Sequence, residues 1–265
     1  MKIIIVGKKS IIAKNLFLFL KKRNNVKLID YKDINFKNKS FTIINCSSKK
    51  TQLKKNVMDR DIKIINKIKK DNIFHYIMLS TSKVYGGKKI IKDETHVCRP
   101  KNVYGIQRLK VEKQIKKILP DNNFTILRLS NVINFDLRKK SYSKTFMNRM
   151  LRDLKYKNFI KIPQEETYKD FIGEKDVFEI IKIIIKRKVF GLYNLSSGIS
   201  ISASIIAKNL IKGYGKNVNI YRDHRLKTDN FTLSNKKLYK LTKYRILKKD
   251  LINQIYNLGK NLRNV

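Results

Sequence analysis

Short runs of apolar, mostly β-branched residues alternate along this chain with stretches in which apolar residues recur every three or four positions. Runs of the first kind predict buried strands, and stretches of the second kind predict amphipathic helices. The predicted strands are Ile3–Val6, Val26–Ile29, Phe41–Asn45, Tyr76–Ser80 and Phe124–Leu129. The predicted helices are Ser10–Lys22, Asp61–Lys70, Tyr104–Leu119, which Pro120 ends, and a hydrophobic helix that contains Ile180–Ile185.

This alternation predicts an α/β fold with a parallel sheet. The unbroken apolar run Ile3–Val6 implies a strand buried on both faces, and therefore helices on each side of a doubly wound, Rossmann-type sheet. Ligands of such sheets bind beyond the carboxyl ends of the strands. After about residue 135 the pattern becomes less regular. Segments such as Phe159–Thr167 and Val218–Thr232 suggest loops and short strands, and hence a small C-terminal lobe.

Composition excludes several classes of protein. A chain of 265 residues with 42% apolar positions can fill a core, so disorder is not expected. Two cysteines are too few for a disulfide scaffold and suit a reducing compartment. No apolar run approaches the length of about 20 residues that a membrane span needs. The first residues contain no signal peptide, and we therefore expect a cytoplasmic protein with no membrane partner.

The formal net charge of +42 raises the question of a nucleic-acid partner, because clustered cations bind phosphate backbones. The cations are 49 lysines and only 13 arginines, whereas phosphate recognition favours the bidentate arginine fork. Lysine, asparagine and isoleucine are abundant together along the whole chain, which favours compositional drift. We expect no nucleic-acid partner, and a milder role remains open in which the positive surface steers small anions toward a cleft.

The turn after the first predicted strand has small residues at its first, fourth and seventh positions, Gly7, Ser10 and Ala13. Gly7 permits a tight turn, and small side chains let the backbone of Ile11 and Ile12 at the helix N-terminus approach a diphosphate. This pattern predicts a dinucleotide-binding turn. An ordinary strand-to-helix turn with Ser10 as the N-cap is the alternative.

An acidic residue ends the second predicted strand. Asp30 follows Gly7 by 23 residues, where a carboxylate accepts hydrogen bonds from the ribose hydroxyls of NAD and repels a 2′-phosphate. This favours NAD, while Lys32 nearby leaves NADP open. A surface turn residue is the alternative interpretation of Asp30.

A second group of residues suggests proton transfer. Thr81 follows a buried strand, and Tyr104 and Arg108 lie one turn apart on a helix, so they share a face. Thr81 would hold a carbonyl or alcohol oxygen while the Tyr104 phenol exchanges its proton. A neighbouring cation favours the phenolate that this chemistry needs. The alternative is a purely structural role, in which these residues belong to a capped helix with a half-buried tyrosine.

Together these motifs resemble the extended short-chain dehydrogenases/reductases, in the NAD-dependent epimerase/dehydratase group that acts on nucleotide sugars. The resemblance covers nearly the whole chain. The matching segments, in order, are Gly7–Ala13, Cys46–Ser48, Ser80–Gly86, Arg99–Gly105, Arg128–Val132, Lys169–Val177 and Gly191–Gly198.

The resemblance implies a cofactor-binding Rossmann domain over residues 1–135, to which about 168–198 return, and a substrate-binding lobe over most of 136–265. It implies hydride transfer with NAD(P), either as a nucleotide-sugar epimerase or as a 4-keto-sugar reductase, by a homodimer. Cys46, Ser47 and Ser48 would line the cofactor together with Tyr104 and Arg108. The substrate, a nucleotide-diphosphate sugar, would contact these residues: Thr81, Ser82, Lys83, Asn131, and Arg222 or Arg225.

Two departures from the family pattern matter. Arg108 stands where the family has its active-site lysine, and Ser82-Lys83 stand where family dehydratases have an Asp-Glu pair. The second departure disfavours a dehydratase, since elimination of water lacks its acid and base. The first leaves a rival hypothesis, a catalytically impaired relative that binds cofactor or RNA. His75 and His96 lack ligand-like partners and Cys98 lies in a polar loop, so no metal site is predicted.

Overall fold

The computed structural model describes residues 2–22, 25–34, 40–47, 59–68, 73–87, 90–134 and 145–264. Its centre is a six-stranded sheet of order β10-β6-β4-β3-β1-β2 in which all neighbouring strands run parallel. The strands are β1 (Lys2–Val6), β2 (Asn25–Ile29), β3 (Phe41–Asn45), β4 (Ile73–Thr81), β6 (Phe124–Leu129) and β10 (Gly191–Leu195). The predicted doubly wound parallel sheet is thus confirmed.

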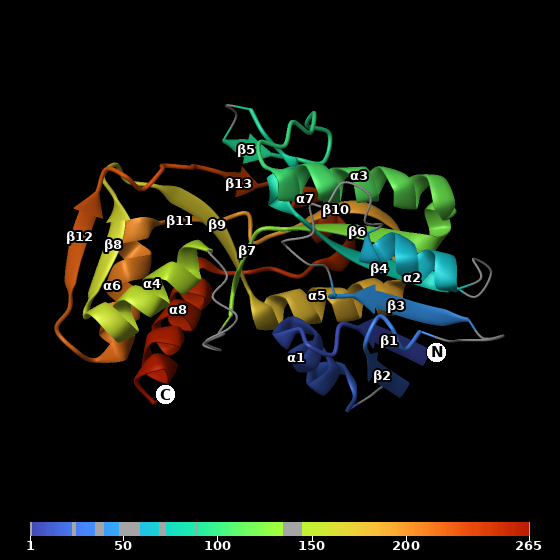
Figure 1. The fold of residues 1–265 in the computed structure, drawn as a ribbon, viewed down its shortest axis with the longest axis horizontal. Coiled ribbons are helices and arrows are strands. Elements are labelled where there is room, and N and C mark those ends of the chain that lie inside the picture. Colours follow the sequence, from blue (N-terminus) through green and yellow to red (C-terminus); the bar gives the residue numbers. More distant parts are fainter. Residues whose placement is uncertain are drawn as a thin grey trace.

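Helices cover both faces of this sheet (Figure 1). One face packs against α1 and α5, and the other against α2 and α3. Alternate strand residues serve the two faces, as β1 illustrates: Ile3 and Ile5 join the first core, and Ile4 and Val6 the second. The bounds of these helices are α1 (Ile11–Leu20), α2 (Arg60–Lys67), α3 (Val103–Ile118) and α5 (Glu174–Arg187).

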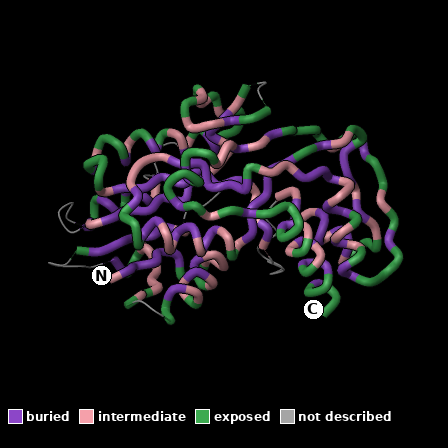
Figure 2. The backbone as a smooth tube through the Cα atoms, turned by 180° about the vertical axis from the view of Figure 1, so that it is seen from behind, coloured by how far each residue is buried: buried purple, intermediate pink, exposed green. Residues whose placement is uncertain are grey.

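Burial on both faces explains why the strands could be predicted from apolar runs. Figure 2 shows buried backbone concentrated in the sheet and exposed positions on the outer helices and loops. Every residue of β3 and of β6 is buried. Phe41–Asn45 and Phe124–Leu129 agree with the predicted strands residue for residue.

The sheet has no strand outside β2 among the described residues. Dinucleotide-binding sheets of the doubly wound type ordinarily have the order 3-2-1-4-5-6, in which a third strand lies beyond the second. Here only residues 30–40 connect β2 to β3, which is too short for a helix and a further strand. The N-terminus of α2 instead lies beside the loop after β2, where Arg60 stacks on Tyr31.

A second group of elements lies at the left of Figure 1. It contains the parallel pair β8 and β12 and three helices that share the first core with α1 and α5. Their bounds are α4 (Phe146–Lys157), β8 (Phe159–Pro163), α6 (Ala203–Tyr214), β12 (Asn219–Asp223) and α8 (Lys248–Arg263). The domain boundaries expected from the sequence stay a prediction.

The loss of regularity expected beyond about residue 135 is wrong, because α4, α6 and α8 are regular amphipathic helices. In α4 the buried residues Met147, Met150, Leu151 and Leu154 follow helical spacing, but lysines and arginines between them lower the mean hydropathy of the segment. Two short strand groups connect this region to the sheet. They comprise β5 (Ile91–Lys92) with β13 (Thr232–Leu233), and β7 (Asn131–Ile133), β9 (Tyr168–Gly173) and β11 (Ser200–Ser202); one further helix is α7 (Lys236–Thr242).

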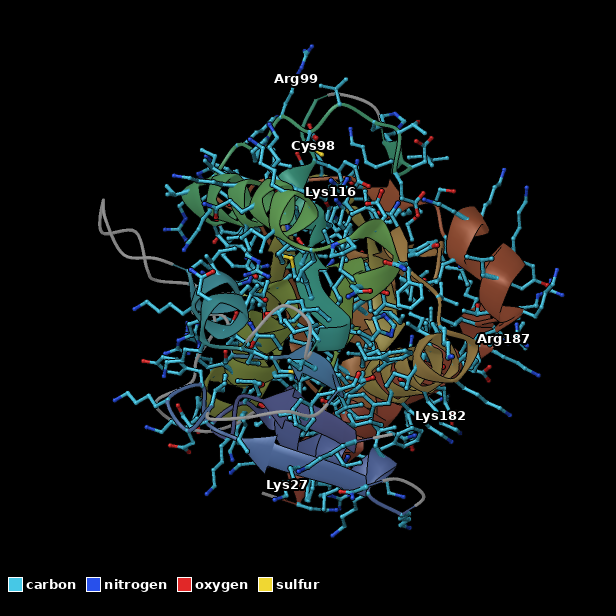
Figure 3. All side chains as sticks on the ribbon, turned by 90° about the vertical axis from the view of Figure 1, so that its right-hand side faces the viewer. Lys27, Cys98, Arg99, Lys116, Lys182 and Arg187 are labelled. Carbon is cyan, nitrogen blue, oxygen red and sulfur yellow. The ribbon has the colours of Figure 1, made fainter. Side chains whose placement is uncertain are left out.

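Basic side chains extend outward from several different elements (Figure 3). Lys27 lies on β2, Lys116 on α3, and Lys182 and Arg187 on α5. No helix in the described part of the chain is both long enough and apolar enough to cross a bilayer.

Candidate active site

Three loops meet at the carboxyl ends of β1, β2 and β3. The N–H groups of Gly7 and Lys8 donate to the carbonyl of Ile29 at 2.8 and 3.1 Å, which ties the turn after β1 to β2. Gly7 has a φ of 128°, and a Cβ there would lie 3.1 Å from the carbonyl carbon of Cys46 and 3.2 Å from the nitrogen of Ser47. Only glycine therefore fits this position without strain.

Helix α1 begins directly above this turn. Ser10 is its N-cap, and its hydroxyl accepts from the N–H of Ala13 at 3.4 Å. Ile11 and Ile12 form the first turn and are half-buried, while Ala13 is fully buried. The dinucleotide and N-cap interpretations of Ser10 are therefore compatible, since a capped helix N-terminus still directs N–H groups and a positive dipole end toward the carboxyl ends of the strands.

The loops after β2 and β3 are joined by the N-terminus of α2. The half-buried Asp30 accepts a hydrogen bond from the Lys32 N–H at 3.2 Å. The next residue, Tyr31, lies under the guanidinium of Arg60 at 4.2 Å, and Arg60 also donates to the carbonyl of Ser47. The N-terminus of α2 is thereby joined to both loops.

The residues after β3 are held by a buried asparagine. The N–H and hydroxyl of Ser47 both donate to Asn45 Oδ1, at 2.9 and 2.6 Å. Burial raises the pKa of the Cys46 thiol to about 12, so this thiol is neutral. Ser48, the third residue of this segment predicted to line a cofactor, lies outside the described residues.

The turn after β4 packs against the start of α3. Thr81 ends β4, and its hydroxyl accepts from the Lys83 N–H at 3.2 Å in the short helix η2 (Ser82–Val84). A Cβ on Gly105 would lie 2.1 Å from the carbonyl oxygen of Lys83. The first turn of α3, with the half-buried Tyr104 at its second position, thus contacts the turn that carries Thr81.

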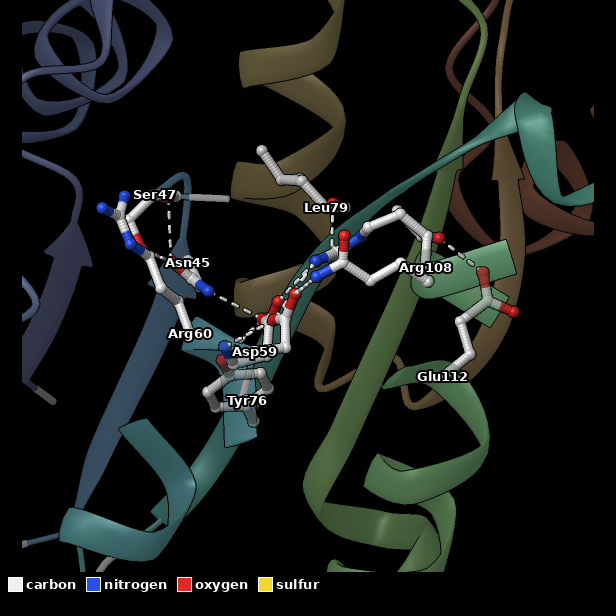
Figure 4. Close-up of polar contacts among 11 residues, drawn as sticks. Asn45, Ser47, Asp59, Arg60, Tyr76, Leu79, Arg108 and Glu112 are labelled. Atoms are coloured by element: carbon white, nitrogen blue, oxygen red, sulfur yellow. Dashed lines mark hydrogen bonds and ion pairs between the residues drawn. The ribbon is translucent and has the colours of Figure 1, made fainter. Parts of the chain in front are cut away.

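Arg108 is 1% exposed, and a buried carboxylate holds its guanidinium (Figure 4). Nη1 donates to Asp61 Oδ2 at 2.8 Å and lies 3.6 Å from Asp59 Oδ1, and Nη2 donates to the Leu79 carbonyl at 3.1 Å. Although burial lowers the pKa of Arg108, the charges of Asp61, Asp59 and Tyr104 raise it above its ordinary value. Among the described residues, Nε of Arg108 has no hydrogen-bond partner.

Asp61 is the centre of this network. Its Oδ1 accepts from Asn45 Nδ2 and from the Tyr76 hydroxyl, each at 2.7 Å. Burial acts to raise the pKa of Asp61, but the Arg108 cation and these hydrogen bonds bring it below the ordinary value. Asp59, the N-cap of α2, has a pKa raised to about 6 by burial and by the charge of Asp61.

A cleft of about 440 Å³ lies beside η2. Lys83 and Asn102, the N-cap of α3, line one side, and residues 227–231 line the other. Lys83 Nζ lies 3.2 Å from Asp229 Oδ2, and the buried Lys169 reaches the same carboxylate at 3.4 Å. The cleft thus lies between the start of α3 and the segment that precedes β13, and its lining includes several lysines.

Comparison of the sequence with models of known protein families gives a match over much of the chain. Residues 39–196 match the model of the NAD dependent epimerase/dehydratase family. The chain belongs to this family. The match covers β3, β4, η2, α3, β6 and β10, and therefore Thr81, Tyr104 and Arg108.

Individual members of the family are only distantly similar. The ADP-L-glycero-D-manno-heptose-6-epimerase of Alkalilimnicola ehrlichii is 23% identical over 155 residues, which is 55% of this chain and 48% of the relative. The chain thus spans about half the length of that curated relative.

Solved structures of similar fold cover the chain almost entirely. A UDP-N-acetylglucosamine 4-epimerase from Methanobrevibacter ruminantium, in complex with UDP-N-acetylmuramic acid, has a TM-score of 0.82 at 15% identity and covers 100% of this chain and 99% of its own. RMD from Pseudomonas aeruginosa, complexed with NADPH, has a TM-score of 0.75 at 15% identity, with 98% and 97% covered. A UDP-glucuronic acid 4-epimerase from Bacillus cereus, in complex with NAD, has a TM-score of 0.78 at 15% identity, with 100% and 99% covered.

Three residues predicted to bind substrate lie apart from the residues that line this cleft. Asn131 donates to the Asp170 carbonyl at 2.9 Å. Arg222 donates to the carbonyls of Pro163 and Gln164, and Arg225 pairs with Asp223 at 3.0 Å. The contact of Asn131 therefore joins β7 to β9, and those of Arg222 and Arg225 lie at β8 and β12; the role of all three toward a substrate stays a prediction.

The sequence motifs did not identify Asn45, Asp61 and Tyr76 as residues of the site. One signal was present: Asp61 shares helical spacing with the buried residues Ile64 and Ile65, so a carboxylate stands on the apolar face of α2. A charge in that position needs a buried partner. Among the described residues, no group of three or more His, Cys, Asp or Glu side chains is placed to hold a metal ion.

Proposed function

We propose that this chain is an NAD(P)-dependent nucleotide-sugar epimerase or 4-keto-sugar reductase. The observation that carries the proposal is the contact between the first turn of α3 and the turn after β4, at the carboxyl edge of the sheet and one strand away from the loop that faces Gly7. A tyrosine, a threonine and a dinucleotide turn thereby line one edge, as hydride transfer from a bound cofactor requires.

The residues at this edge fit a dinucleotide. Gly7 leaves no side chain between the turn and the loop after β3, and the N-terminus of α1 supplies N–H groups for a diphosphate. Ser10, Ile11, Ile12 and Ala13 would border the diphosphate. Cys46 and Ser47 would line the ring side of the crevice. When bound, NAD(P) would supply the hydride acceptor and donor.

Asp30 would bind the ribose hydroxyls of the adenosine half, which favours NAD. Arg60, stacked on Tyr31 beside it, leaves NADP as the second form, because a guanidinium near this ribose would accommodate a 2′-phosphate. Arg108 would lie beside the other ribose, with its guanidinium held by Asp61 and the Leu79 carbonyl.

Proton transfer would fall to this chain's own side chains. The Tyr104 phenolate would take the proton from a sugar hydroxyl while the Thr81 hydroxyl holds the same oxygen. Tyr104 would return the proton when the carbonyl is reduced. Arg108, one turn further along α3, would stabilise the phenolate through its charge. An epimerase would perform both half-reactions on one sugar, and a reductase only the second.

The sugar would lie toward the lysine-rich cleft, with Ser82 and Lys83 on its near wall. Asn131 and either Arg222 or Arg225 would contact the remainder of a nucleotide-diphosphate sugar. A dehydratase is disfavoured because Ser82 and Lys83 supply no carboxylic acid or carboxylate for elimination. The cleft carboxylate of Asp229 is already paired with two lysines. A cytoplasmic homodimer is the form of the protein that we propose.

The test is a panel of UDP-, GDP- and dTDP-sugars with and without added NAD(P)H, together with mass spectrometry of any cofactor that co-purifies. Retained NAD(P) with turnover of one sugar, lost in Tyr104→Phe, supports the proposal. Absence of turnover across the panel, combined with tight RNA binding that weakens steeply with salt, supports the impaired relative instead.

A further inference from the structure

The positive charge of Arg108 is paired with the negative charge of Asp61. Its guanidinium and the carboxylate of Asp61 are 2.8 Å apart, with side chains 2% and 0% exposed. Tyr104 lies one helical turn before Arg108, and the two groups interact electrostatically. The Tyr104 phenol is therefore influenced by the field of the Arg108–Asp61 ion pair and not by that of a lone cation.

We propose that Asp61 is a positioning residue that sets the pH range over which Tyr104 exchanges its proton, by fixing Arg108 and opposing its charge. This inference rests on the proposed function, in which Tyr104 is the acid and base. Nothing in the family pattern assigns a role to position 61.

The argument is electrostatic. An unpaired cation beside a phenol stabilises the phenolate, and a carboxylate at similar distance destabilises it. Within a region from which water is excluded, both effects are larger than at a surface. Because Asp61 lies 2.8 Å from Arg108, its negative charge opposes that of Arg108 at Tyr104, and the phenolate gains less than it would from a lone lysine or arginine.

The geometry also fixes the guanidinium. Asp61 holds Nη1, the Leu79 carbonyl holds Nη2, and Asn45 and Tyr76 hold Asp61 in turn. A guanidinium bound at both terminal nitrogens cannot rotate to another partner without breaking a buried hydrogen bond. Asp61 therefore determines both the position and the effective charge of Arg108.

The other titratable groups packed around this pair are Asp59 on α2, Tyr76 on β4 and Cys46 after β3. Burial raises the pKa of Tyr76 and of Cys46, so both are neutral near pH 7. Asp59, whose pKa is about 6, lies 3.6 Å from Arg108 and adds a second negative charge above that pH. It should act in the same direction as Asp61 but more weakly.

The decisive variant is Asp61→Asn, which keeps the size of the side chain and an acceptor for Arg108 while removing the charge. We expect the ionisation midpoint of Tyr104 to fall by about one pH unit, which is the order of magnitude for the loss of one nearby charge at an effective dielectric constant of about 20. The midpoint is measured in the chain without cofactor, by NMR of ring-¹³C tyrosine, with the Tyr104 signal identified by its loss in Tyr104→Phe.

Two further variants separate charge from structure. Asp59→Asn keeps a good N-cap residue and should lower the midpoint by a smaller amount, which tests the inference even where Asp61→Asn fails to fold. Tyr76→Phe removes a hydrogen bond to Asp61 and leaves every charge in place, so the Tyr104 midpoint should stay within about 0.2 pH unit of the wild type.

A midpoint that stays within about 0.2 pH unit or rises in the folded Asn variants overturns the inference, and so does an equal fall in Tyr76→Phe. Where the wild type turns over a sugar, the limb of its kcat profile that reports Tyr104 should shift to lower pH in Asp61→Asn by the same amount as the midpoint. This is the rising acidic limb for an epimerase, in which the phenolate acts first, and the falling alkaline limb for a reductase, in which the phenol donates. A chain without turnover contradicts the proposed function, whereas the tyrosine titration still decides the role of Asp61.

Discussion

The buried imidazole of His75 should make the stability of this protein depend on pH in the range from 7.5 to 5. His75 lies on β4 and is 0% exposed, and burial lowers its pKa from 6.5 to about 4. Its Nε2 lies 2.6 Å from Thr125 Oγ1, whose own proton goes to the Val189 carbonyl at 2.5 Å. Nε2 must therefore carry the proton, which leaves Nδ1 as a bare acceptor.

Protonation would place an N–H on Nδ1, which has no hydrogen-bond partner among the described residues and is shielded from solvent. The folded state thus resists protonation more than the unfolded state does. Since the folded pKa is the lower one, stability is fully present above pH 6.5 and is lost as pH falls toward 4. The difference between pKa values of 6.5 and about 4 corresponds to about 3.4 kcal/mol in total, of which about 2 kcal/mol is lost by pH 5.

The assay compares urea unfolding of the wild type and of His75→Gln at pH 7.5 and at pH 5.0. Glutamine can still donate to Thr125 but does not titrate. Asp170 and Asp59, whose burial raises their pKa values to about 7 and about 6, act in the opposite direction in both proteins, so the comparison cancels them. The stability advantage of the wild type over the variant should shrink by about 2 kcal/mol between the two pH values.

The control is His224→Gln, because His224 is exposed and lies on the loop after β12. The difference in unfolding free energy between the wild type and His224→Gln should change much less between pH 7.5 and pH 5.0. A wild-type advantage over His75→Gln that changes by less than about 0.5 kcal/mol would show that His75 protonates with little penalty, and the dry, partnerless environment assigned to Nδ1 would be wrong.

Three further outcomes test the proposed site. Tyr104→Phe should reduce turnover by a factor of about 10² to 10⁴ while NAD(H) affinity, measured by calorimetry, stays within about threefold; equal turnover removes Tyr104 from the reaction. Asp30→Ala should weaken NAD more than NADP in the same binding assay, and an unchanged preference contradicts the ribose assignment. Gly105→Ala should lower kcat at least tenfold, because its Cβ would lie 2.1 Å from the Lys83 carbonyl and must push α3 away from the Thr81 turn, whereas a wild-type rate shows that this contact does not position Tyr104.

The sequence predicted the central sheet well because its signal is local. A strand buried on both faces must be apolar at successive positions, and this chain places such runs between helices with clear spacing. The helices α4, α6 and α8 carry the same kind of signal, but lysines on their exposed faces obscured it. The absence of a strand outside β2 among the described residues could have been predicted by counting, since only eleven residues separate Ile29 from Phe41.

The candidate site was predictable to the extent that topology determines it. Parallel strands bring their carboxyl ends to one edge, so Gly7, Thr81 and Tyr104 were expected to gather there, and the structure brings the loops that carry them to that edge. The cleft beside η2 was not predictable, because its far wall at 227–231 comes from a segment whose path depends on tertiary packing.

The partner of Arg108 lies beyond any local pattern. Asp61 precedes Arg108 by 47 positions, and the two meet only because α2 and α3 pack on the same face of the sheet. An arginine at position 108 can therefore be interpreted only together with the acid at position 61. Viewed alone, the arginine suggests either a working substitute for lysine or a lost site. Viewed as a pair, it is a larger cation whose unit charge is balanced and whose guanidinium is held by a buried carboxylate, so we expect the electrostatics at Tyr104 to depend on both residues.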